Sequence, residues 1–274
     1  MSNPTVTDQP RDGHRIDTAW VDVPVGQHAS STAATMSAYL AQPAERGRWP
    51  VVLVGFEMFG VTGYVRSIAD RLATAGYVAM VPDFYHRHDS GSGSHVELSA
   101  NAEGRTRGLE LVAALRRDEV REDVQGALDY LALHPAGNGT TAMLGLSAGG
   151  HIAYYVASQV PLSALVVFYP GWLTGTDIAL SRPEPTLALT PRIAQLGTPV
   201  LFLVGEDDHL FTAGQRDEIA DQMDRAGLRH EMVVYPDTPH GFFCDERDTY
   251  RADAAVDAWD RVLRLLAASA GLRR

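Results

Sequence analysis

Three short segments carry residues that together could do nucleophilic acyl chemistry. Residues 145–149 (GLSAG) place Ser147 between small residues, and Asp208 and His240 follow two later apolar runs. A serine hydroxyl attacks well only when a base takes its proton, and a carboxylate can orient that base. We therefore expect Ser147 to be the nucleophile, His240 the general base and Asp208 the acid that orients the histidine.

The surroundings of Ser147 strengthen this expectation. The G-x-S-x-G pattern follows a predicted strand over 141–146 and opens a predicted helix over about 147–158, which is the context of a nucleophile elbow. Small neighbours are needed because the sharp turn strains the serine and would make side chains collide. The motif alone also fits a glycine-rich turn or half of a dinucleotide fingerprint, although G-x-G-x-x-G is not present. The chain order serine, aspartate, histidine is that of α/β-hydrolases.

Nearby residues include an alternative orienting acid and candidate oxyanion-hole donors. Asp207 is the alternative orienting acid, although an acid beside a loop is usually solvated, and His209 is interpreted as structural or exposed. The apolar run 51–56 leads into the position from which this fold donates an oxyanion-hole N–H. We expect the backbone N–H groups of Met58 and Ala148 to form that hole.

Apolar runs alternate with helical patterns along most of the chain, which predicts a mostly parallel sheet with helices on both faces. Residues 16–25 and 36–41 are expected to pair as an antiparallel edge. The expected fold is a single-domain α/β-hydrolase over residues 15–274, after a flexible tail at 1–14. Two segments that lack this alternation of strand and helix patterns, His86–Ser99 and Gly171–Gly197, are interpreted as long loops near the expected active site. The later strands are expected at 49–56, 77–82, 141–146, 164–169, 199–204 and 230–235.

The composition argues against several other classes of protein. The 274 residues carry a net charge of −11 and no basic run, which argues against nucleic acid. Cys244 is the single cysteine, so an intrachain disulfide and cysteine-based metal sites are excluded. His86 and His88 lack a nearby third ligand, and we expect no metal and no cofactor. Without a signal-like or membrane-length apolar run, we expect a cytoplasmic monomer or weak homo-oligomer whose partner is a small-molecule substrate, with no membrane contact.

Five separated blocks resemble the dienelactone hydrolases, α/β-hydrolases of enol lactones and other small esters. They are residues 57–61, 82–87, 145–150, 205–209 and 235–242. The resemblance implies that Asp208 and His240 are the acid and base and that Glu57 faces the elbow. It also implies that Arg87 holds a substrate carboxylate and that three aromatic residues are pocket walls, namely Tyr85, Tyr169 and Trp172. Phe242, beside the histidine, either lines the pocket or fills the core.

Two positions depart from that family. Its well-known members have cysteine where this chain has Ser147, so Glu57 instead hydrogen-bonds Ser147, pairs with Arg87 or caps a local turn. Cys244 stands where a second carboxylate-binding arginine is expected, which favours neutral or less anionic esters as substrates, and it is interpreted as an inert thiol. The function expected is ester or lactone hydrolysis through an acyl-enzyme. The alternatives are a non-catalytic ligand-binding relative and a cysteine-type enzyme carrying a Cys-to-Ser replacement.

Overall fold

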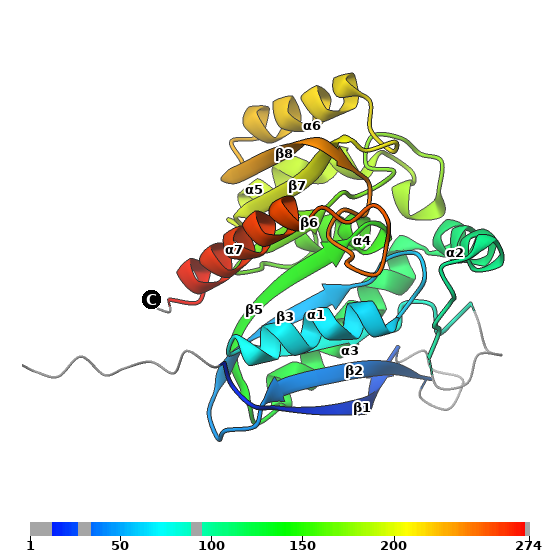
Figure 1. Ribbon diagram of the computed structural model, residues 1–274. Coiled ribbons are helices and arrows are strands. Elements are labelled where there is room, and N and C mark those ends of the chain that lie inside the picture. Colours follow the sequence, from blue (N-terminus) through cyan, green and yellow to red (C-terminus); the bar gives the residue numbers. More distant parts are fainter. Residues whose placement is uncertain (1–12, 27–33, 89–94, 272–274) are drawn as a thin grey trace, which may run out of the picture.

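The computed structural model describes residues 13–26, 34–88 and 95–271, and within them eight strands form one sheet (Figure 1). The strands are β1 (Ile16–Val25), β2 (Ala34–Pro43), β3 (Trp49–Gly55), β4 (Val78–Pro82), β5 (Gly137–Leu146), β6 (Leu165–Phe168), β7 (Val200–Asp207) and β8 (His230–Pro239). The α-helices are α1 (Gly63–Thr74), α2 (Ala102–Ala114), α3 (Arg117–Leu133), α4 (Ala148–Ala157), α5 (Thr190–Gln195), α6 (Ala213–Arg225) and α7 (Ala252–Ser269). Two 3-10 helices are η1 (Ala179–Ser181) and η2 (Thr186–Leu189).

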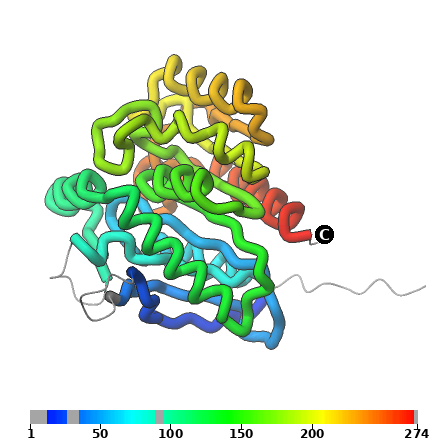
Figure 2. Tube along the Cα trace, turned by 180° about the vertical axis from the view of Figure 1, so that it is seen from behind, coloured from blue at the N-terminus to red at the C-terminus, as the bar shows by residue number. Residues whose placement is uncertain are grey.

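The sheet has the strand order β1-β2-β4-β3-β5-β6-β7-β8. Every neighbouring pair from β4 to β8 is parallel, whereas β1 pairs with β2, and β2 with β4, in the antiparallel sense. Helices α1 and α7 cover one face of the sheet, and α3 and α4 cover the other, which faces the viewer in Figure 2. The predicted α/β architecture and its antiparallel edge are therefore confirmed.

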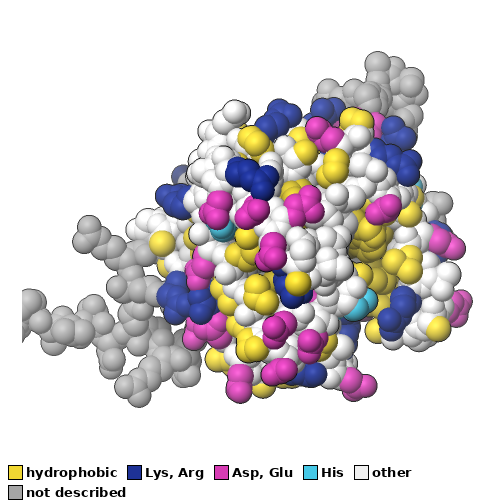
Figure 3. All heavy atoms as spheres, turned by 90° about the horizontal axis from the view of Figure 1, so that it is seen from above, with side chains coloured by type: hydrophobic (Ala, Val, Ile, Leu, Met, Phe, Trp, Pro, Cys, Tyr) yellow, Lys and Arg dark blue, Asp and Glu magenta, His cyan; other side chains and the backbone are white. Residues whose placement is uncertain are grey.

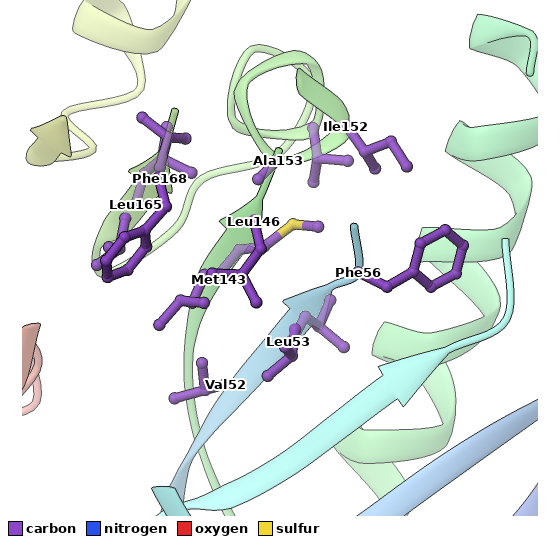
Figure 4. Close-up of a cluster of buried hydrophobic side chains, with 14 of the residues drawn as sticks. Val52, Leu53, Phe56, Met143, Leu146, Ile152, Ala153, Leu165 and Phe168 are labelled. Carbon is purple, nitrogen blue, oxygen red and sulfur yellow. The ribbon is translucent and has the colours of Figure 1, made fainter. Parts of the chain in front are cut away.

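The core lies between the central strands and these helices because the strand sequences are almost wholly apolar. Every residue of β6 is buried, as is every residue of β3 after Trp49. Leu53 of β3, Met143 of β5 and Ile152 of α4 are among the buried side chains of this core that Figure 4 shows. Burying apolar side chains of this size stabilises a fold by about 1.5–3 kcal/mol each. A rigid centre of this kind can hold the loops at the carboxyl ends of the strands.

Three sequence expectations need correction. Helix α2 was not predicted, because glycine occupies much of its buried face: Gly104 and Gly108 are buried there beside Leu111 and Val112. A Cβ on Gly108 would lie 2.7 Å from the Met58 carbonyl oxygen, so the helix packs through bare backbone and shows no clear apolar stripe. The segment expected as one long loop at 171–197 contains η1, η2 and α5.

The third correction concerns the expected tail at 1–14. Residues 1–12 lie outside the described residues, but His14 belongs to the folded domain. Its backbone N–H donates to the Thr74 carbonyl at 2.9 Å, and its ring lies 4.7 Å from that of Trp49. The folded domain therefore already includes His14.

Charged side chains of both signs are interspersed with apolar ones on the face seen in Figure 3. Among the described residues, no helix combines the length and apolarity that crossing a membrane would require.

Candidate active site

Ser147 sits in a strained turn between β5 and α4. Its backbone has φ 52° and ψ −113°, a region that residues other than glycine rarely adopt. The turn is held by backbone contacts: the Ser147 N–H donates to the Phe168 carbonyl at 3.0 Å, and the Gly149 N–H donates to the Phe56 carbonyl at 2.7 Å. A Cβ on Gly149 would lie 2.2 Å from the Gly55 carbonyl carbon. Only glycine fits there, which explains the small residues around the serine.

A continuous hydrogen-bonded chain links Ser147, His240 and Asp208. The Ser147 Oγ lies 3.0 Å from His240 Nε2, and His240 Nδ1 lies 2.9 Å from Asp208 Oδ2 and 3.1 Å from Oδ1. Because the carboxylate can only accept, we assign the ring proton to Nδ1, which leaves Nε2 free to accept the serine proton. Asp208 and Ser147 are each 2% exposed, so water competes little for these bonds.

The residues beside the acid occupy different places. Asp208 follows β7 and also accepts a bond from the Leu210 N–H at 2.9 Å, which fixes its carboxylate. Asp207 is exposed at the end of the same strand and is absent from the His240 contacts. The exposed His209 ring lies 5.4 Å from that of His240, edge to face. The geometry thus brings Asp208, and not Asp207, to the histidine.

Met58, which lines the pocket with Ser147, and Ala148, the first residue of α4, carry the two backbone N–H groups expected to donate to an oxyanion. Within the described residues, neither backbone N–H donates to another group. The Met58 carbonyl accepts a bond from the Tyr85 hydroxyl at 3.2 Å. Tyr85 is fully buried, so it supports the Met58 loop from behind and does not form the pocket wall that was expected.

The remaining aromatic residues divide between pocket and core. Trp172 lines the pocket. Tyr169 is fully buried, its ring edge-on to that of His240 at 4.8 Å, so it backs the histidine. Phe242 is also fully buried and packs on Tyr169 and Tyr235, which makes it a core residue.

The buried Glu57 forms an ion pair with the partly buried Arg247, a residue that the sequence analysis did not single out. The Tyr169 hydroxyl also donates to Glu57, at 3.4 Å. Burial acts to lower the pKa of Arg247, but the Glu57 carboxylate, together with smaller contributions from Cys244, Tyr169 and Tyr64, raises that pKa overall. Glu57 therefore contacts neither Ser147 nor Arg87, contrary to two of the three arrangements considered.

Arg87 points elsewhere. Its guanidinium donates to the buried Asp123 of α3 at 2.6 Å and to Glu122 at 3.4 Å, and it does not line the pocket. The expectation that Arg87 would hold a substrate carboxylate is therefore not supported by its position. The two neighbouring histidines also contact carboxylates of α3: His86 Nε2 lies 3.0 Å from Asp123, and His88 Nε2 lies 2.9 Å from Glu119. In the described part of the chain, no three metal-ligating side chains cluster.

Cys244 is buried close to the Glu57–Arg247 pair. Burial, with a contribution from the Glu57 carboxylate, raises the pKa of its thiol to about 12. A thiol in that state stays protonated near neutral pH and is a poor nucleophile.

A pocket of about 560 Å³ opens over Ser147 and His240. Its walls come from several separate segments: residues 57–59, Arg105 and Leu109 of α2, Trp172, the pair His209 and Leu210, and residues 246–249. The contribution of α2 could not be foreseen because the helix itself was not predicted. The pocket is large enough for a small organic molecule.

The sheet order, the strained serine turn and the Ser147–His240–Asp208 contacts define an α/β-hydrolase. The sequence model of the dienelactone hydrolase family matches residues 36–270. The chain belongs to that family, whose members are hydrolases.

Curated relatives and a solved structure agree with this assignment. A Synechocystis protein named "Putative carboxymethylenebutenolidase" is 32% identical over 235 residues, covering 84% of this chain and 90% of that protein. A Bradyrhizobium protein named "Probable 2-oxo-3-(5-oxofuran-2-ylidene)propanoate lactonase" is 30% identical over 245 residues, covering 89% of this chain and 91% of its own length. A crystal structure titled "Putative Dienelactone Hydrolase" from Klebsiella pneumoniae has a TM-score of 0.79 and 28% identity, covering 93% of this chain and 99% of its own.

Proposed function

We propose that this hydrolase cleaves small carboxylic esters or lactones by covalent catalysis on Ser147. The observation that carries the proposal is the hydrogen-bonded chain from the Ser147 Oγ through His240 to Asp208, at 3.0 Å and 2.9 Å, on the wall of an open pocket. Relatives with lactonase and carboxymethylenebutenolidase names support the same substrate class.

In the first half-reaction, the Ser147 Oγ attacks the ester carbonyl while His240 Nε2 takes the hydroxyl proton. Asp208 keeps the ring in the required tautomer and stabilises the imidazolium that forms. The negative charge moves to the carbonyl oxygen, and the N–H groups of Met58 and Ala148 would stabilise it there. Each preorganised donor of this kind contributes about 3 kcal/mol at the transition state. Collapse of the intermediate breaks the ester C–O bond, and His240 returns its proton to the departing alcohol.

In the second half-reaction, water replaces the alcohol. His240 takes a proton from the water as it attacks the acyl-enzyme carbonyl, the same two N–H groups stabilise the charge, and the Ser147 Oγ leaves with the proton from His240. The products are a free acid and the regenerated serine. Glu57 takes no proton in this scheme, because it is paired with Arg247.

The charges around the pocket favour neutral substrates. Arg87 is bound by Asp123, and Arg247 is neutralised by Glu57. The acidic residues Glu246 and Asp248 line the pocket, together with a single further arginine, Arg105 of α2. An ester carrying a carboxylate gains little from such a lining. We therefore expect a p-nitrophenyl ester of a short fatty acid to have a higher kcat/KM than dienelactone.

The test is formation of an acyl-enzyme. Mixing the protein with p-nitrophenyl acetate should give a burst of nitrophenol followed by steady turnover, and mass spectrometry should locate an acetyl adduct on Ser147. Ser147→Ala should show neither. No adduct and no turnover would overturn the proposal. Ser147→Cys would then separate the two alternatives, because regained activity indicates a cysteine-type enzyme and continued inactivity indicates a binding protein.

A further inference from the structure

A buried histidine that the proposed mechanism does not use lies one helical turn beyond Ser147. His151, on α4, is 1% exposed. Its Nδ1 lies 2.9 Å from the Gly171 carbonyl oxygen and its Nε2 lies 2.7 Å from the Thr186 Oγ1. Both partners belong to the segment between β6 and β7, which also carries the pocket residue Trp172. His151 therefore joins the helix of the nucleophile to a wall of the pocket.

The partners of His151 fix its protonation state. The Gly171 carbonyl can only accept, so we assign the ring proton to Nδ1, and Nε2 then accepts from the Thr186 hydroxyl. Burial lowers the pKa of His151 to about 3, and the nearby Arg117 adds to that effect. The Arg117 Nη2 also donates a hydrogen bond to the Thr186 Oγ1, at 3.4 Å. The ring is thus neutral, with one nitrogen donating and the other accepting, and it links α4 to the segment between β6 and β7.

The backbone next to the His151–Gly171 hydrogen bond is strained. Trp172 has φ 59°, in the left-handed region that a bulky residue adopts only when its surroundings hold it. Two side chains hold the backbone there: His151 donates to the carbonyl of Gly171, and the Ser181 Oγ donates to the carbonyl of Trp172 at 3.0 Å. Strain that is maintained on both sides in this way points to a functional requirement for the position of the indole.

We propose that His151 is a positioning residue that determines ester selectivity. Its Nδ1–H bond to Gly171 fixes the backbone at Trp172, and the indole then limits the space beside Ser147. Without that bond, Trp172 relaxes toward an unstrained φ and the pocket widens. This inference rests on the proposed ester hydrolysis only for its kinetic readout.

The kinetic experiment compares kcat/KM for p-nitrophenyl acetate and the bulkier p-nitrophenyl octanoate. His151→Leu preserves volume but removes both hydrogen bonds, so the ratio of acetate to octanoate should fall about tenfold, the scale on which pocket fit acts. His151→Asn presents an N–H close to the position of Nδ1 and should restore most of the wild-type ratio. A role in packing alone would give the opposite ranking, because leucine fills the space better than asparagine.

Tyr154→Phe is the matched control. It removes a buried bond of 2.6 Å between the Tyr154 hydroxyl and Thr190, which also joins α4 to the segment between β6 and β7 but does not hold Trp172. The control should lower the melting temperature and leave the acetate-to-octanoate ratio unchanged. The inference is wrong if His151→Leu keeps the wild-type ratio, or if Tyr154→Phe changes it equally.

A second readout does not depend on turnover. The fluorescence of Trp172 is obtained as the difference between each protein and its Trp172→Phe counterpart, and quenching by acrylamide reports how exposed the indole is. Quenching should increase in His151→Leu and return toward the wild-type value in His151→Asn. If the wild-type protein hydrolyses neither ester, the proposed function fails while this measurement still tests His151. Unchanged quenching in His151→Leu would overturn the inference by itself.

Discussion

Glu57 and Arg247 are 190 residues apart in the chain and form a partly buried ion pair in the pocket that holds Ser147. The Glu57 carboxylate is thus occupied by a guanidinium, while Ser147 has His240 as its hydrogen-bond partner. Serine needs a base at the moment of attack, whereas a cysteine can be activated as a resting thiolate. The pairing fits the proposed serine nucleophile, for which His240 is the proposed base.

Glu57→Gln should release Arg247 and change substrate preference. The kcat/KM for an ester carrying a carboxylate, divided by that for its neutral methyl ester, should rise about tenfold, because a freed guanidinium can make a charge-assisted bond to the substrate. The unfolding free energy should fall by up to about 3 kcal/mol, since the side chain of Arg247 is only 25% exposed. The double variant Glu57→Gln/Arg247→Met is the control and should lose the gain for the anionic ester. An unchanged ratio in Glu57→Gln would contradict the role given to Arg247.

Asp208→Asn should lower kcat for p-nitrophenyl acetate by about 10⁴, the loss seen when this change imposes the wrong histidine tautomer in a serine triad. The fold should persist, because the side chains are nearly the same size. Asp207→Asn is the matched control at the adjacent, exposed position and should retain nearly full activity. Comparable losses in the two variants would show that Asp208 alone does not orient His240.

Gly149→Ala should disrupt the serine turn. The added Cβ would lie 2.2 Å from the Gly55 carbonyl carbon, a backbone atom that cannot move without displacing β3. We expect a large drop in melting temperature and loss of esterase activity. Gly214→Ala in α6 is the control, because its Cβ would meet nothing within 4 Å and alanine favours a helix. A Gly149→Ala protein with normal stability and activity would refute the close contact.

The buried His151 should make stability depend on acid. Its pKa is lowered to about 3 in the folded protein, against 6.5 in an unfolded chain. Between these values the unfolded chain binds a proton that the folded chain does not, so the unfolding free energy falls as the pH falls, by up to about 1.4 kcal/mol per pH unit. Urea unfolding of the wild-type protein and His151→Asn between pH 6.5 and 4.5 measures this term. The variant should lose stability less steeply, by about one proton, and equal slopes would contradict the prediction.

The sheet could be predicted from sequence because its strands are continuous apolar runs that only a doubly covered sheet accommodates. The spacing of Ser147, Asp208 and His240 after three such strands then placed all three at one edge, where they meet. Backbone-driven features were harder to predict. Helix α2 packs through Gly104 and Gly108, so it lacks the apolar periodicity by which a helix is usually recognised.

Two arginines, Arg87 and Arg247, show a second limit of prediction from sequence. Arg87 lies in a motif that matches the family, but its partners Glu122 and Asp123 belong to α3, and no local pattern signals that pairing. Arg247 follows Cys244 by one turn and supplies the cation beside Glu57 from a position that the family pattern does not mark. Long-range ion pairs of this kind depend on how separate loops fold together, which sequence spacing does not record.

The contact between Gly55 and Gly149 has a consequence for how this enzyme can change. The turn that carries Ser147 is held by main-chain contacts, whereas Leu109 and Trp172 reach the pocket from two stretches of chain that carry none of the three proposed catalytic residues. Reactivity and substrate choice are therefore encoded in different parts of the gene. Point mutations in those two codons should change the range of accepted substrates while the Ser147 turn stays unchanged, which makes them natural positions for directed evolution.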